Sequence, residues 1–160
     1  NKERKIYFNE EFGLAKAVFS GKMTKFIETP NETIYKGILE KVDDNGNTTY
    51  KQNYQYKPRF EVGDVVKIEG GDPMAIEITD VKFITIDELR NMTDSDFLSM
   101  GIIRITDFYT YQNGRRFKSA YKAYVNLLYR MKELDSIEES DVMFLYTFKT
   151  KICPKWTDQY

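Results

Sequence analysis

Alternation of apolar and polar residues dominates the middle of the chain and predicts a sheet. In 74–84, Met74, Ile76, Ile78 and Asp80 alternate with Ala75, Glu77, Thr79 and Val81. A period of two places the two sets on opposite faces, which predicts a half-buried antiparallel strand. Other strands are expected over 6–8, 33–40, 48–56, 60–68 and 142–151. The turn residues Asp-Asp-Asn-Gly-Asn at 43–47 join two of these strands into a long, polar hairpin.

Residues 10–20 and 119–134 instead show the spacing of amphipathic helices. The apolar stripe of the first consists of Leu14, Ala17 and Val18. Two short helices are expected after 74–84, and the second is opened by Thr93, with Asp96 three residues later in an approximate capping arrangement. Because no strand-helix-strand rhythm is present, we expect an α+β fold: a small mixed β-barrel of five to seven strands with peripheral helices.

Composition limits the number of domains and the classes of partner. With 160 residues, 41% of them hydrophobic, the chain is long enough for one core, so we expect a single domain over 1–160 with its core at about 5–151 and a tail at 152–160. The formal net charge is −1, so nothing attracts the whole chain to nucleic acid or to a membrane surface. Binding to either would require a local patch.

The scarcity of certain side chains excludes several kinds of site. The chain has one cysteine, Cys153, which rules out an internal disulfide framework and is typical of a reducing compartment. No apolar run approaches the length of a membrane span, so the cytoplasm is the expected location, although the first residue is Asn1 and not Met. Without histidine, no transition-metal site, no cofactor and no Ser-His or Cys-His catalysis is expected, which leaves Lys, carboxylates, Thr or Tyr for any chemistry.

Three stretches carry a family resemblance. They are YFNEEFGLAKAV at 7–18, FEVGDVV followed by ITDV and the short helices within 60–102, and RFKSAYKAY at 116–124. Together they resemble the ASCH domain, a small β-barrel family related to the PUA RNA-binding modules, over roughly 7–151. The resemblance implies a PUA-like barrel and a ligand among RNAs or modified nucleosides.

In family members that hydrolyse acylated cytidine nucleosides, the resemblance implies a Lys and a Thr in the loop after the first helix, and a Glu just before the glycine of a short helix. The loop of this chain is Gly-Lys-Met-Thr-Lys-Phe at 21–26. Aligned without a gap, Met23 replaces the Lys, Thr24 matches an adjacent Thr, and Phe26 replaces the functional Thr. Met100 stands where the Glu is expected. These replacements favour a non-catalytic member of the family.

Two lysines and one aspartate are nevertheless candidates for catalysis. A shift of one residue in the loop would let Lys22 or Lys25 supply the amine. Asp96 precedes Met100 by four residues, so on a helix it would share the face of Met100 and could replace the carboxylate. The alternative is structural: the lysines are solvated after a helix C-terminus, Met100 fills the core, and Asp94 and Asp96 cap a helix.

A basic and aromatic segment gives the best local signal for nucleic acid. Arg115, Arg116, Lys118 and Lys122 are interleaved with Tyr109, Tyr111, Phe117, Tyr121 and Tyr124. Arginine can hold phosphate while aromatic faces stack on unpaired bases. A solvated face, with part of the aromatic set in the core, is the alternative. The candidate ligand-binding residues are therefore Lys22, Thr24, Lys25, Arg115, Arg116, Lys118, Tyr121 and Lys122.

Three functions remain open at this point. The first, which we place ahead, is a non-catalytic module that binds RNA or a modified nucleoside. The second is a diverged amidohydrolase acting on N4-acylated cytidine through Lys22 or Lys25 with Asp96. The third is a protein-interaction or assembly scaffold that uses the hairpin at 41–57 or the aromatic tail at 154–160.

Overall fold

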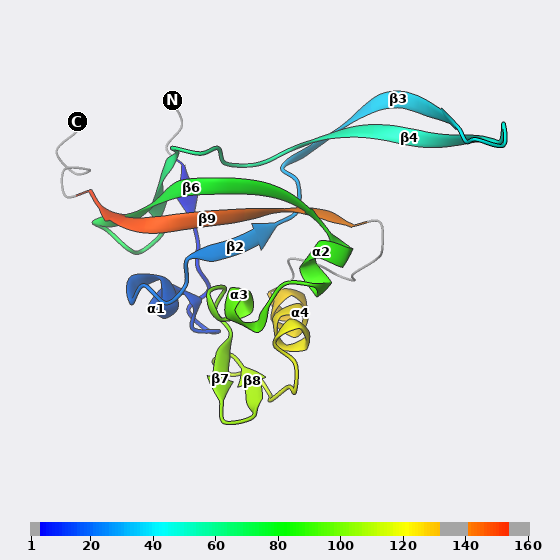
Figure 1. Cartoon of the computed structure of the whole chain (residues 1–160). Coiled ribbons are helices and arrows are strands. Elements are labelled where there is room, and N and C mark those ends of the chain that lie inside the picture. The colour runs from blue at the N-terminus through cyan, green and yellow to red at the C-terminus, as the bar shows by residue number, and fades with distance from the viewer. Residues whose placement is uncertain (1–3, 132–140, 154–160) are drawn as a thin grey trace. The chain divides into compact units, whose positions relative to one another are not determined.

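The computed structural model describes residues 4–131 and 141–153 (Figure 1). The described part is a mixed α+β fold, mostly strands, with four short helices. Its elements are β1 Lys5–Ile6, α1 Leu14–Phe19, β2 Lys25–Glu28, β3 Glu32–Val42, β4 Thr48–Lys57, β5 Val65–Ile68, β6 Met74–Thr85, α2 Ile86–Arg90, α3 Asp94–Leu98, β7 Ile103–Ile105, β8 Phe108–Thr110, α4 Ala120–Arg130 and β9 Val142–Ile152. None of these helices is long and apolar enough to cross a membrane. The tail at 154–160 lies outside the described residues.

The chain divides into two compact units. One is the β3–β4 hairpin with its flanks, Pro30–Arg59, and the other comprises the described residues before and after it. The hairpin confirms the strands expected over 33–40 and 48–56 and the turn between them, where Asp43 accepts hydrogen bonds from the backbone N–H groups of Asn45 and Asn47. These bonds hold the pKa of Asp43 below its usual value. That the whole chain is one domain stays a prediction.

A five-stranded sheet with the order β1-β5-β6-β9-β2 forms the framework of the larger unit. Every pairing is antiparallel except that of β1 with β5. The longest ladder joins β6 to β9, and it shifts register between Ile78 and Asp80, as expected for a β-bulge. The prediction of a half-buried antiparallel strand over 74–84 is confirmed by its pairing with β5 and β9. The expected placement of Asp80 on the face of Ile76 and Ile78 is wrong: Asp80 is exposed, because the register shift precedes it.

The described strands do not close into the barrel expected from the sequence. β1 and β2 are the edges of the five-stranded sheet and do not pair with each other, while β3–β4 and β7–β8 form separate two-stranded sheets. Closure requires the two edge strands to continue the hydrogen-bond ladder around the sheet. β1 has two residues and β2 has four, which is too little for such a ladder.

The core of the larger unit lies between the sheet and the helices α1, α3 and α4, which Figure 1 shows on one side of it. Phe26 of β2 stacks on Tyr146 of β9 with 4.9 Å between the ring centres. Ala123 and Leu127 of α4 are fully buried. The apolar stripe predicted for this helix therefore faces the core, and α4 begins after Ser119, whose hydroxyl accepts a hydrogen bond from the N–H of Lys122.

The first helix is shorter than its apolar pattern suggests. A helix over 10–20 was expected, but 10–13 form turns and α1 begins at Leu14. Gly13 has a φ of 78°, a left-handed conformation that the helix cannot include. Asn9 does accept a hydrogen bond from the N–H of Phe12 at 3.2 Å, so its side chain caps this turn, not the helix itself.

Candidate functional site

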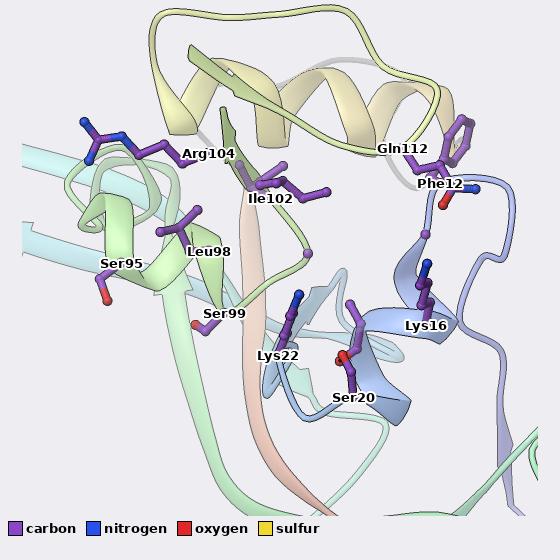
Figure 2. A pocket seen from close by; sticks show the side chains of 14 residues that line it. Phe12, Lys16, Ser20, Lys22, Ser95, Leu98, Ser99, Ile102, Arg104 and Gln112 are labelled. Atoms are coloured by element: carbon purple, nitrogen blue, oxygen red, sulfur yellow. The ribbon is translucent and has the colours of Figure 1, made fainter. Parts of the chain in front are cut away.

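A cavity of about 650 Å³ lies between α1 and the segment from α3 to β7 (Figure 2). This volume is typical of sites for small ligands. Its lining consists of Phe12, Gly13, Lys16, Ala17, Ser20, Lys22, Ser95, Leu98, Ser99, Gly101, Ile102, Ile103, Arg104 and Gln112. The walls are mainly apolar, and the polar lining residues are hydroxyls, one amide and three cations. No carboxylate is among these lining residues.

The loop after α1 is fixed by backbone hydrogen bonds, and these position Lys22. Gly21 has a φ of 78° and turns the chain, and the N–H groups of Lys22 and Met23 both donate to the carbonyl of Ala17. The N–H of Thr24, two residues after Lys22, donates to the carbonyl of Ser99 at 2.8 Å. The loop is therefore attached to both walls of the cavity, and Lys22 stands between these attachments.

Two lysines give the cavity its positive charge. Figure 2 shows Lys16 and Lys22 extending from the α1 side into the space that faces Ile102. Within the described part of the chain, neither ammonium group forms an ion pair. An anion bound here would therefore not have to displace a carboxylate from either lysine.

Arg104 lies at the other end of the lining and is partly engaged. Its Nε donates to the carbonyl of Thr106 at 3.1 Å, and its guanidinium carbon is 6.0 Å from the centre of the Tyr109 ring. The phenol of Tyr109 in turn donates to Asp94 at 3.1 Å. Arg104 is thus oriented by the β7–β8 turn, and Lys16 and Lys22 carry the charge on the α1 side.

A second hollow of about 590 Å³ adjoins the cavity and shares Lys16, Ser20 and Gln112 with it. Its other lining residues are Glu10, Ala15 and Phe19. Glu10 brings a carboxylate to this second hollow, so the electrostatic preference for an anion is strongest on the side of the cavity that Lys22 lines.

The structure brings two of the three catalytic candidates together, but away from the cavity lining. Lys25 Nζ lies 3.2 Å from Asp96 Oδ1. The other carboxylate oxygen, Oδ2, accepts hydrogen bonds from the N–H and the hydroxyl of Thr93, which completes a capping box at the start of α3. Partial burial raises the pKa of Asp96, but the bonds from Thr93 and Lys25 outweigh it and hold that pKa below its usual value.

This arrangement supports the structural alternative for Asp96 and Lys25. The aspartate stays ionised and caps a helix, and the ammonium of Lys25 is directed at it. Asp96 does not share a helical face with Met100 as expected, because α3 ends at Leu98 and the chain then turns, with the N–H of Met100 donating to the carbonyl of Phe97. Thr24, half-buried, is not among the cavity-lining residues either.

The three residues that the resemblance aligns with functional positions of the ASCH domain belong to the core. Met23, Phe26 and Met100 are all buried, and Met100 is fully inaccessible. A fully enclosed position cannot present a side chain to a ligand. The interpretation of Met100 as a core residue is confirmed.

The cations of the basic and aromatic segment are exposed. Arg115, Arg116, Lys118 and Lys122 all lie at the surface. The Arg115 guanidinium carbon is 4.9 Å from the centre of the Phe117 ring, a cation–π contact that orients the side chain. The first of these cations, Arg115, follows three residues after Gln112, which lines the cavity.

The tyrosines of this segment are mostly committed to packing. Tyr111 and Tyr124 are buried, and the Tyr111 hydroxyl donates to Asn126 and accepts from Arg130. Tyr121 is half-buried, with its ring edge against Phe97 at 6.1 Å between centres. Only Tyr109, Phe117 and Tyr121 of the aromatic set therefore keep surface that a base could contact.

The sequence pointed to Lys22 but not to Lys16, Arg104 and the serines of the cavity. Lys16 of α1 and Ser20, the C-cap of this helix, are four residues apart, a spacing that places them on one face and was the available signal. The positions of Ser95, Ser99 and Arg104 depend on how α3 packs opposite α1, which no local pattern reveals. Among the described residues, no three His, Cys, Asp or Glu side chains gather as a metal site would require.

No protein-family model matches the chain, and no curated protein or solved structure matches it either. The resemblance to the ASCH domain therefore rests on the residues quoted above, and the argument for function rests on the cavity.

Proposed function

We propose that this protein is a non-catalytic, PUA-like binding module of the ASCH type that holds a nucleotide of single-stranded RNA in the cavity between α1 and the α3–β7 segment. The observation that carries the proposal is the combination of apolar walls with Lys16 and Lys22, two cations that form no ion pair in the described part of the chain.

The lining suits the separate parts of a nucleotide. A base is flat and largely apolar on its faces, so it fits against Phe12, Leu98 and Ile102. The phosphate group would then lie near the ammonium groups of the two lysines, where charge-assisted hydrogen bonds are strong. A free nucleoside has no anion for these lysines, so the charge pattern favours a nucleotide over a nucleoside.

The exposed arginines give a strand longer than one nucleotide a further place to bind. Arg115 and Arg116 lie three and four residues after Gln112, which lines the cavity. Phosphates that follow the bound nucleotide would meet these cations, and Phe117 and Tyr121 offer partial aromatic surface beside them.

A diverged amidohydrolase is the second candidate, favoured by the meeting of Lys25 with Asp96. Two facts oppose it: the Lys25 amine is engaged by Asp96, and neither residue lines the cavity. Incubation of the protein with an N4-acylated cytidine nucleoside tests this candidate. Enzymatic release of the free acid, abolished by Lys25→Ala, would establish it.

The proposal is tested by fluorescence anisotropy of a short, labelled single-stranded RNA titrated with the protein at two salt concentrations. We expect saturable binding that weakens as salt rises, because phosphate contacts release counterions. A duplex RNA of the same sequence is the matched control and should bind less well, since its bases are stacked and paired. Absence of saturable binding at low salt would contradict the proposal.

A further inference from the structure

The β3–β4 hairpin has two chemically different faces. Residues paired across an antiparallel ladder share a face, and successive pairs alternate. The register pairs Tyr35 with Tyr54, Glu40 with Tyr50, and Val42 with Thr48. One face, called here the tyrosine face, therefore carries as its large side chains Tyr35, Ile38, Val42, Tyr50, Tyr54 and Tyr56.

An irregularity in β3 keeps this face continuous. Between Tyr35 and Ile38 the register shifts, so that three steps along β3 match two steps along β4. The added residue restores the alternation and returns Ile38 to the side of Tyr35. Without it, the tyrosines near one end and the aliphatic residues near the other would lie on opposite faces.

Five of the six large side chains of the tyrosine face are exposed, and Tyr56 is half-buried. The exposed fractions of the five are 69% at Tyr50, 65% at Ile38, 59% at Val42, 53% at Tyr35 and 38% at Tyr54. The rings of Tyr35 and Tyr54 are 5.6 Å apart between centres, so they form one continuous surface. No residue of 30–59 is buried. A two-stranded hairpin with no buried residue is only marginally stable in water, so a partner that covers the ribbon would add to its stability.

The area of the face suits a dimer. A large side chain has a surface of about 150–250 Å². Multiplied by the exposed fractions of these five residues, this gives a total exposed area of roughly 500 Å². The largest apolar patch on a typical monomer has about this size and is often functional. Two such faces together bury about 1,000 Å², the area at which specific protein interfaces begin.

Charge identifies the kind of partner. Glu40 is the one charged side chain at the paired positions of the tyrosine face, whereas the opposite face carries Lys41, Lys51 and Lys57. RNA would find no cation on the tyrosine face. A second copy of the same face meets no strong repulsion, because it is nearly neutral.

We propose that the tyrosine face is the interface between two copies of this chain, stacked face to face with their strands antiparallel about a two-fold axis near Ile38. In this arrangement Tyr35 lies opposite the partner's Glu40, and Tyr54 lies opposite the partner's Tyr50. This arrangement separates the two Glu40 carboxylates and places each of them opposite the phenol hydroxyl of Tyr35 in the other copy. Aromatic and branched aliphatic side chains pair favourably across such contacts.

Analytical ultracentrifugation of the full chain over a range of concentrations tests this interface. The wild type should sediment as a dimer that dissociates on dilution. Ile38→Lys and, separately, Tyr50→Lys should each raise the dimer dissociation constant at least tenfold, because each places a charge at the centre of the interface. Leu39→Lys is the matched control: Leu39 is 52% exposed and adjacent to Ile38, but on the opposite face, so its substitution should leave the dimer unchanged.

Far-ultraviolet circular dichroism of each variant should match the wild type, since the substituted side chains are exposed. A wild-type chain that stays monomeric at every concentration would overturn the proposal, as would equal weakening by the substitutions on both faces. Because no RNA is present in the measurement, its outcome is separate from that of the proposed ligand.

Discussion

Lys25 and Asp96 are 71 residues apart in the sequence, and their side chains meet at 3.2 Å between Nζ and Oδ1. The pair joins the start of β2 to α3. Backbone hydrogen bonds join the same two segments, since the N–H groups of Thr24 and Lys25 both donate to the carbonyl of Ser99. The α1–β2 loop that carries Lys22 is therefore held to the opposite wall of the cavity.

The lowered pKa of Asp96 predicts an acid-sensitive contribution to stability. The group binds a proton less readily in the folded chain than in the unfolded one, so its contribution is complete above the unfolded pKa near 3.8 and is lost as the pH falls through the lower folded pKa. Asp96→Asn should lower the free energy of unfolding by about 1 kcal/mol at pH 7. Urea unfolding at pH 7 and at successively lower pH measures this. If the difference in unfolding free energy between the wild type and Asp96→Asn stayed constant as the pH falls, the acid-sensitive contribution assigned to Asp96 would be contradicted.

Removal of the Thr93 hydroxyl should affect both stability and binding. Thr93 caps α3, which supplies Ser95 and Leu98 to the cavity, so Thr93→Ala should cost about 1 kcal/mol of unfolding free energy and should weaken RNA binding severalfold. Thr85→Ala is the matched control, because Thr85 forms the same kind of capping box at α2, which does not line the cavity. Urea unfolding should show similar destabilisation of both variants. Equal RNA affinities for both would show that α3 does not position the ligand.

Gly101 is predicted to be irreplaceable in the cavity wall. Its φ is 101°, and a Cβ at this position would collide with Leu14 Cδ2. Gly101→Ala should therefore cost about 2 kcal/mol or more in unfolding free energy. Gly21→Ala separates the strain of a positive φ from the collision with Leu14. Gly21 also has a positive φ, but nothing lies within 4 Å of a Cβ at this position. In thermal unfolding, the melting temperature of Gly101→Ala should be clearly lower than that of Gly21→Ala. Equal melting temperatures would argue against the collision.

A carboxylate should not be tolerated at position 100. Met100 is fully buried, so Met100→Glu would bury a charge without a partner and should cost about 3 kcal/mol or more. Met100→Leu conserves the volume and should cost less than about 1.5 kcal/mol. Urea unfolding of the two variants compares them directly. A glutamate variant as stable as the leucine variant would indicate that this position can open toward a ligand.

Much of the fold could be predicted, because the long elements have clear periods. The hairpin, β6, α4 and β9 follow from alternation, turn residues and an apolar helix face. β2, β7 and β8 were missed, because runs of three or four residues contain too little of a period to detect. Their strand conformation comes from pairing: β2 is held by β9, and β7 and β8 hold each other. The barrel was inferred from the number of strands and from the resemblance, and neither reports how far the edge strands extend.

The site could be predicted only where the chain marks it locally. Lys22 follows a helix-ending glycine, and the structure places it at the cavity. Lys25 and Thr24 are neighbours of Lys22 in the sequence but are absent from the cavity lining: Lys25 begins β2 and its ammonium group pairs with Asp96, and Thr24 directly precedes that strand. The opposite wall, from Ser95 to Arg104, depends on the packing of α3 against the rest of the larger unit, and this is a property of tertiary structure.

Lys16 and Lys22 are proposed to hold the phosphate of a bound nucleotide. The most direct measurement is the salt dependence of single-stranded RNA binding by Lys16→Ala and Lys22→Ala, with Lys82→Ala as control. Lys82 is an exposed lysine of the same unit that already has a carboxylate partner, Glu88, at 3.9 Å. Each cavity variant should weaken binding and reduce the slope of log affinity against log salt by about one, whereas Lys82→Ala should change neither. Unchanged affinity and slope in both cavity variants would contradict the claim.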